Sequence, residues 1–136
     1  MEKALQDRLR SALAEAVGSF EDRPSVDWSE RRSNDRSAFP AIVLSTVSPG
    51  REYYQDGADG TTQPRIRAEV FALSPLAVKA AKQAVVDEME LAATSGGVHF
   101  RPSRLAFERD SDPETLAGGL KIFRTILDFF VPNSPA

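Results

Sequence analysis

The middle of the chain places a long polar loop, an alternating run and a capped helix in direct succession. The loop, from Ser48 to Pro64, is rich in Gly and Asp and contains both tyrosines of the chain. Compact domains rarely keep connections of this length unless the loop is a functional surface or is disordered. Because its residues form no recognisable catalytic set, we interpret the loop as an assembly surface.

The run from Arg65 to Leu73 has the two-residue period of a strand with one buried face. One face carries Ile66, Ala68, Val70 and Ala72, and the other carries Arg65, Arg67, Glu69 and Phe71. Ser74 and Pro75 then form a helix start, with an N-cap followed by proline at the first helical position. The pattern predicts a helix to about Ala93 whose alanines allow close approach to a sheet.

Other elements follow from periodicity and from Gly and Pro positions. We expect a helix from Glu2 to Val17 with a stop at Gly18, strands at Ser25–Ser29, Ala41–Ser48, Val98–Arg109 and Leu120–Val131, and turns at 29–38 and 110–119. Pro102 favours an edge position or a bulge within its strand. The order α-β-β-β-α-β-β predicts an α+β fold, with a mainly antiparallel sheet packed against two helices. We expect one domain over residues 1–131 and a frayed tail at 132–136.

Composition excludes several classes of function. The 136 residues carry a formal charge of −3, which offers no general attraction for nucleic-acid phosphates. Without cysteine there is no disulfide, thiolate metal site or cysteine nucleophile. The first residues lack a signal-peptide core, and no stretch approaches the length of a membrane span. We therefore expect a soluble protein with no membrane partner.

Few residues of the sequence have the type and spacing of a catalytic or metal-binding site. His99 is the single histidine, without a second ligand nearby in sequence, and we interpret it as a surface residue. No nucleophile elbow or phosphate-binding glycine motif is present. Glu108, Asp110, Asp112 and Glu114 alternate in a way that can hold Ca²⁺ or Mg²⁺, but the EF-hand offsets are not met, and turn formation explains them better. We expect no enzyme activity, no catalytic residue, no metal and no cofactor.

Tyr53 and Tyr54 are the residues of the loop that most favour a binding role. Tyrosine offers a large apolar area and a hydroxyl at small entropic cost, which suits an anchor for a protein partner. The other reading, that one tyrosine covers the end of the sheet, stays open. With their loop neighbours Arg51, Asp56 and Asp59, they are the candidate oligomer or partner interface.

Taken in order, the segments VDW, FPAIVLSTVS, YYQDGADG, RIRAEVFALS and FRTILDFFVP resemble the tail completion proteins of long-tailed phages, prophages and gene transfer agents. These are also called tail terminator or tail-to-head joining proteins, and the resemblance covers residues 1–131. It implies a virion protein whose protomers form a ring, commonly a hexamer. Such a ring ends the tail tube, contacts the tail tube protein and the head connector, and lets DNA pass without specific binding.

On this interpretation the loop from Ser48 to Pro64 is mobile in the free protomer and becomes ordered on assembly. Two other classes remain open: a small α+β protein-binding module, and an enzyme that uses carboxylates with a divalent metal. A module reading RNA on its sheet needs exposed aromatic rings on central strands beside a basic surface. The apolar strands and the acidic balance argue against that module.

Overall fold

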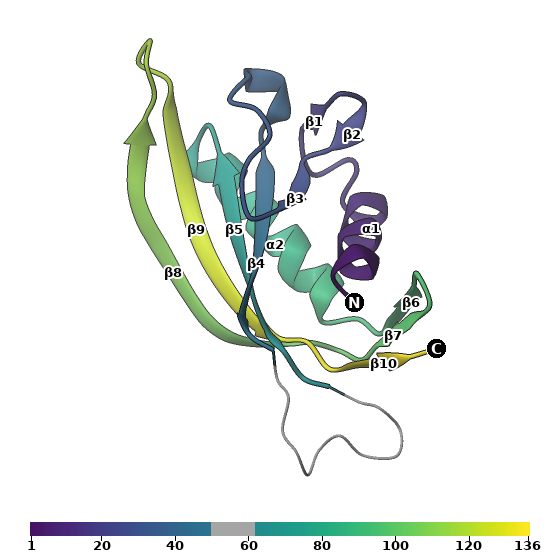
Figure 1. The fold of residues 1–136 in the computed structure, drawn as a ribbon. Coiled ribbons are helices and arrows are strands. Elements are labelled where there is room, and N and C mark those ends of the chain that lie inside the picture. The colour runs from purple at the N-terminus through teal and green to yellow at the C-terminus, as the bar shows by residue number, and fades with distance from the viewer. Residues whose placement is uncertain (50–61) are drawn as a thin grey trace.

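The computed structural model describes residues 1–49 and 62–136, and Figure 1 shows how their elements are arranged. The helical elements are α1 (Glu2–Ala12), the 3-10 helix η1 (Arg36–Ala38) and α2 (Pro75–Met89). The strands are β1 (Ser19–Phe20), β2 (Arg23–Pro24), β3 (Val26–Trp28), β4 (Ala41–Ser48), β5 (Arg65–Ala72), β6 (Ala93–Ser95), β7 (Val98–Phe100), β8 (Arg104–Thr115), β9 (Lys121–Phe130) and β10 (Asn133–Pro135).

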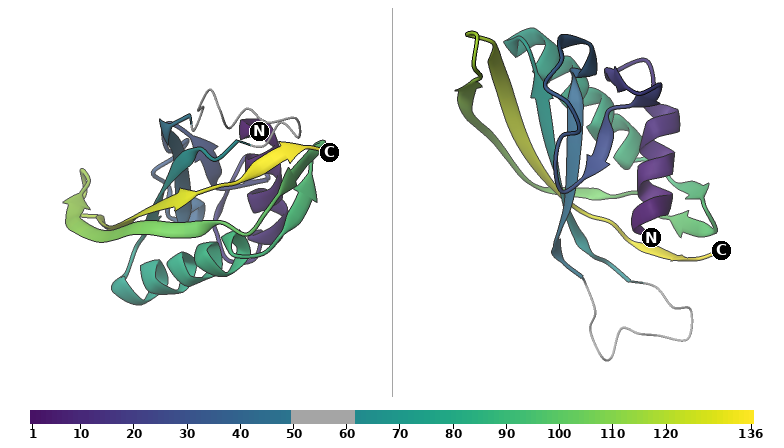
Figure 2. Two further views of the ribbon diagram at one scale, coloured as in Figure 1. Left: turned by 90° about the horizontal axis from the view of Figure 1, so that it is seen from below. Right: turned by 45° about the horizontal axis from the view of Figure 1, so that its top comes forward.

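A five-stranded sheet in the order β3-β4-β5-β9-β8 is the main layer of the molecule. Its strands pair antiparallel, except β3 and β4, which are parallel. Both helices lie on one side of this sheet, with α2 against β5 and β9 and α1 beside β3 (Figures 1 and 2). Small sheets formed by β1-β2 and by β10-β7-β6 complete the described chain. The predicted α+β fold, with a mainly antiparallel sheet and two helices, is confirmed.

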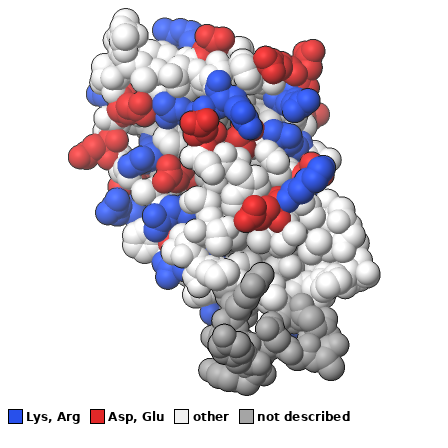
Figure 3. Space-filling model, in the orientation of Figure 1, with Lys and Arg blue, Asp and Glu red and all other residues white. Residues whose placement is uncertain are grey.

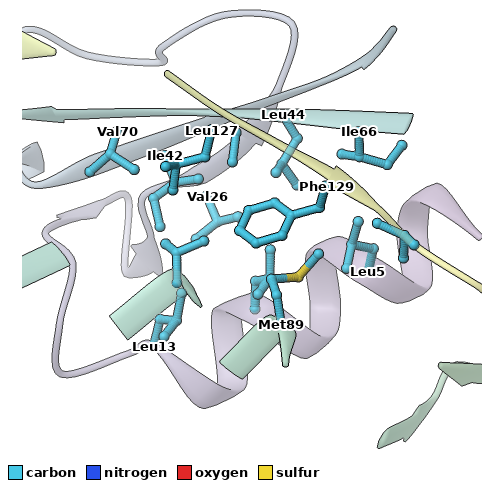
Figure 4. Close-up of a cluster of buried hydrophobic side chains, with 14 of the residues drawn as sticks. Leu5, Leu13, Val26, Ile42, Leu44, Ile66, Val70, Met89, Leu127 and Phe129 are labelled. Atoms are coloured by element: carbon cyan, nitrogen blue, oxygen red, sulfur yellow. The ribbon is translucent and has the colours of Figure 1, made fainter. Parts of the chain in front are cut away.

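The main core fills the space between the sheet and the two helices (Figure 4). Leu5 and Leu9 of α1, Val85 and Met89 of α2, and Phe129 of β9 are all at most 2% exposed. Burying a side chain of this size stabilises the fold by about 1.5–3 kcal/mol. The predicted buried face of β5 is confirmed, because Ile66, Ala68, Val70 and Ala72 are all buried.

Helix α2 begins as predicted but ends earlier. The Ser74 hydroxyl oxygen accepts a hydrogen bond from the backbone N–H of Ala77 at 3.1 Å, which is the expected N-cap. The helix stops at Met89 rather than near Ala93, because residues 93–95 pair with β7 in a hairpin. Two glycines at positive φ form the turn of that hairpin. The sequence predicts a chain reversal at the glycine pair but wrongly extends the helix up to it, because it misses the strand at 93–95.

Helix α1 ends at Ala12, not at the predicted Val17. Beyond it the chain forms a turn in which the N–H of Val17 reaches the carbonyl oxygen of Leu13 at 3.1 Å. Gly18 lies past this turn, where a Cβ atom would come within 2.5 Å of the backbone of Ala38. The glycine is therefore required for close backbone approach rather than as a helix stop.

Arg8 connects the two helices from within the core, although it is a charged residue. It is 5% exposed and donates hydrogen bonds to the carbonyl oxygens of Glu88 and Leu91, at 2.6 and 2.9 Å. It also pairs with the Glu88 carboxylate at 3.0 Å, and its guanidinium lies 5.3 Å from the centre of the Phe100 ring. These contacts add a side-chain donor to carbonyl groups in the last turn of α2 and just beyond it, where the helix itself supplies too few N–H groups.

The predicted strand over Val98–Arg109 is two strands. Strand β7 ends before Pro102, which has no N–H to donate, and β8 begins at Arg104 in the main sheet. Strand β8 then runs to Thr115, through residues predicted as a turn. Two register shifts, at Leu105/Phe107 and Ser111/Glu114, accommodate this irregular sequence. The turn itself is confined to residues 116–119.

The predicted fraying of residues 132–136 is wrong. Asn133–Pro135 form β10, which pairs antiparallel with β7. The backbones of Asn133 and Thr62 exchange two hydrogen bonds of 2.9 Å, so the tail also fixes the chain that leads into β5. Local composition misses this strand because its stability comes from partners far away in sequence.

Candidate functional site

The five interface residues predicted from the sequence, Arg51, Tyr53, Tyr54, Asp56 and Asp59, lie outside the described residues. The candidate site of the described chain is the side of the main sheet that faces away from the helices, which we call the open face. It carries the outward side chains of β4, β5, β9 and β8. Apart from the loop after β3 near one end, no element of the described chain packs across it (Figures 1 and 2).

One end of the open face holds a group of arginines around a buried carboxylate. Asp128 is 0% exposed and accepts hydrogen bonds from Arg65 at 2.8 Å and from Arg67 at 2.8 Å. Two residues further along β9, Phe130 lies between Arg65 and Arg104, whose guanidiniums are 5.9 and 5.1 Å from the ring centre. We call Arg65, Arg67 and Arg104 the arginine cluster.

The charges of this group stabilise one another. Burial pushes the pKa of Asp128 up, but hydrogen bonds from Arg67 and Arg65 outweigh burial and bring that pKa below its usual value. The hydrogen bond to Asp128 raises the pKa of Arg67 in return. Asp128 therefore stays ionised at neutral pH and holds two guanidiniums in fixed positions.

The opposite end of the open face is balanced in charge. Arg31 binds the Glu114 carboxylate at 3.1 Å and lies 4.5 Å from the centre of the Phe71 ring. The hydrogen bond from Arg31 lowers the pKa of Glu114. Arg124 faces Glu69 at 3.8 Å. Figure 3 shows basic and acidic side chains intermixed over the upper part of the molecule, and basic ones alone at the lower left.

The residues considered for catalysis or metal binding lie apart from one another. His99 is exposed, and its Nδ1 lies 2.7 Å from the Thr94 hydroxyl. Glu108 pairs with Lys82 at 3.1 Å, and Asp110 accepts a hydrogen bond from Thr125 at 2.7 Å. Over residues 1–49 and 62–136 there is no group of three His, Asp or Glu side chains that could hold a metal ion.

A second surface feature is an apolar groove beside the start of α2. Its volume is about 340 Å³, and its lining includes Leu76, Val78 and Phe123. Leu76 is 81% exposed, and Leu91, just beyond the other end of α2, is 58% exposed. Exposed leucines of this kind are typical contact residues when they flank a groove.

Comparison with solved structures finds the same fold in a viral-type particle. A chain of the structure described as "Virion of native gene transfer agent (GTA) particle" superposes with a TM-score of 0.60 and 15% sequence identity. The match covers 98% of this chain and 94% of that chain. The two chains share a fold from end to end. No family model and no curated protein matches the sequence, and no helix in the described part of the chain is long and apolar enough to cross a membrane.

One residue of the sequence could have indicated the arginine cluster, although the apolar residues around it drew attention to the core instead. Asp128 interrupts the apolar run from Ile126 to Val131, and a carboxylate in such a run needs a cationic partner. The two-residue alternation correctly predicts that Arg65 and Arg67 point outward from their strand. Pairing them with Asp128 requires the strand order, which places β9 next to β5.

Proposed function

We propose that this protein is a structural component of a phage-like particle, a protomer of a ring that ends the tail tube and joins it to the head connector. The observation that carries the proposal is the end-to-end fold match with a chain of a gene transfer agent virion. The resemblance of the sequence segments to tail completion proteins supports the same assignment. In this role the protein acts by binding other proteins, and it needs no catalytic group.

Ring closure requires two different, complementary surfaces on each protomer. The described chain offers the groove at Leu76, the exposed Leu91 and the unpaired edge of β8. The loop residues Tyr53 and Tyr54 add aromatic anchors in this proposal. A ring built in this way is completed by the tail tube and the head connector on its two faces.

The test is the native mass of the full chain by light scattering over a range of protein concentrations. We expect a discrete species of about six protomers, or a shift towards it as concentration rises. Tyr53→Ala should weaken this species because it removes the aromatic anchor, whereas Tyr53→Phe should retain it. Both variants should keep the wild-type far-UV circular dichroism.

A protein that is monomeric at every concentration, and that also fails to bind assembled tail tubes in sedimentation, would contradict the ring proposal. Unchanged assembly in Tyr53→Ala would remove that residue from the interface while leaving the ring in place.

A further inference from the structure

We infer that the arginine cluster on the open face is a binding site for the phosphate backbone of nucleic acid, without sequence preference. The chain as a whole is acidic, with a formal charge of −3. Yet Arg65, Arg67 and Arg104 surround Asp128, and these four side chains carry a net charge of +2 (three positive minus one negative). Glu69, the next outward residue of β5, also acts on Arg67, but its own charge is offset by Arg124 at 3.8 Å. The inference concerns one face of the protomer and does not depend on ring formation.

The carboxylate of the group is buried in the sheet, while the guanidiniums reach the surface. Asp128 is fully buried, while the side chains of Arg65 and Arg67 are 34% and 36% exposed. Their Nε and Nη2 atoms bind the carboxylate, so their Nη1 atoms remain without a hydrogen-bond partner within the described chain. Arg104 is exposed, and among the described residues its side chain contacts the ring of Phe130.

The donors are also held in place before any ligand arrives. Asp128 fixes the guanidiniums of Arg65 and Arg67, whose Cα atoms are two residues apart on one strand and therefore about 6.8 Å apart. Phe130 supports Arg65 and Arg104 from between them. Guanidinium groups positioned in this way lose little conformational freedom on binding and match the geometry of phosphate oxygens.

The same geometry argues against base recognition and against a protein partner at this site. Phe130 already has a guanidinium close to its ring on either side, so it is not a free platform for a base. The side chains of the cluster are charged apart from Phe130, whereas the buried anchor of a protein interface needs an apolar pocket such as the groove at Leu76. A polyanion needs only charge and N–H donors, which the cluster supplies.

The experiment measures binding of the full chain to a short fluorescein-labelled DNA duplex by anisotropy, from about 20 to about 200 mM NaCl. We expect weak binding at low salt that falls with a log–log slope of about −2 to −3, the value for two or three phosphate contacts. Arg104→Glu should weaken binding at the lowest salt about tenfold and flatten the slope. Arg104→Lys should retain most of the binding because the charge is kept.

The matched control is Arg36→Glu, which makes the same charge change at an exposed position in η1, away from the cluster. We expect it to bind the duplex like the wild type. Phe107→Ala, which removes the exposed ring that β8 places opposite Asp128, should also leave binding unchanged if phosphate alone is bound. Duplex binding that is absent at low salt, or that falls equally in Arg104→Glu and Arg36→Glu, would overturn the inference.

A labelled poly-glutamate chain separates nucleic acid from an acidic protein partner. We expect it to bind more weakly than DNA of the same total charge. Equal affinity for poly-glutamate, or a large loss of binding in Phe107→Ala, would reassign the cluster to a protein. Loss of duplex binding in a variant that still forms the ring would leave the proposed function untouched.

Discussion

At the scale of single residues, Asp128 is the side chain on which the open face depends. It combines full burial with an ionised state, and it keeps that state because two guanidiniums bind it. Removing one partner of a buried ion pair is costly because the other charge stays behind. Here the charges left behind are arginines about one-third exposed, which water can reach, so the cost is smaller than for a pair that is buried on both sides.

The lowered pKa of Asp128 predicts how stability depends on pH. A carboxyl group whose pKa is lower in the folded state stabilises the fold above its unfolded pKa of 3.8, and this contribution is lost as pH falls through the folded value. We expect Asp128→Asn to reduce the free energy of unfolding by about 2 kcal/mol at neutral pH. The variant should also lose stability less steeply than the wild type below about pH 4.

The measurement is urea denaturation of both proteins at a series of pH values. Glu114→Gln is the matched control, since it removes an ion pair whose carboxylate is 48% exposed. It should cost at most about 0.5 kcal/mol. Equal effects of the two substitutions would show that burial of Asp128 has no energetic consequence.

At the scale of elements, the last strand is small but connects three distant parts of the chain. Strand β10 pairs with β7, and Asn133 bridges to Thr62 before β5. The Asn133 side chain also donates to the carbonyl oxygen of Val131 at 3.0 Å. The strand therefore connects β7 to the segment that leads into β5.

Deleting residues 132–136 should destabilise the protein, because the backbone groups of β7 and Thr62 lose their partners. We expect a loss of about 1–2 kcal/mol, which corresponds to a melting temperature about 4–8 °C lower for a chain of this size. Scanning calorimetry measures the shift, with Ser134→Ala as the control that keeps the backbone pairing. A truncated protein with the melting temperature of the wild type would contradict this expectation and support the frayed tail predicted from the sequence.

At the scale of the whole molecule, the two sides of the sheet have different roles. One side is closed by the helices and contains the main core, while the other presents charge to its surroundings. The groove at Leu76 lies on the helix side, beside the start of α2. The proposed assembly contact at Leu76 and the proposed phosphate contact at Arg104 can therefore be tested by separate mutations.

Leu76→Asp should weaken assembly without unfolding the protomer. The side chain is 81% exposed, and an acidic residue in the first turn of α2 is compatible with the helix dipole. We expect light scattering to show a smaller mean mass at equal concentration, with an unchanged melting curve. Ala14→Asp, an exposed position beyond α1, is the control and should assemble normally. Identical masses for the two variants would place the ring contact elsewhere.

The sequence by itself determined the local elements whose signals are local. The two-residue period of β5 and the N-cap at Ser74 appear as predicted, because each depends on neighbours within a few residues. The α+β class followed from their order. The predicted loop interface at 51–59 remains a prediction.

Only the tertiary structure decided which distant residues meet. The pairing of Arg65 and Arg67 with Asp128 depends on β9 lying next to β5, and the end of α2 on the β6–β7 hairpin. The strand at Asn133 exists because β7 offers it an edge. For the arginine–Asp128 pairs and for the strand at Asn133, the stabilising partner lies tens of residues away, and its free energy is gained only once the chain has closed around it.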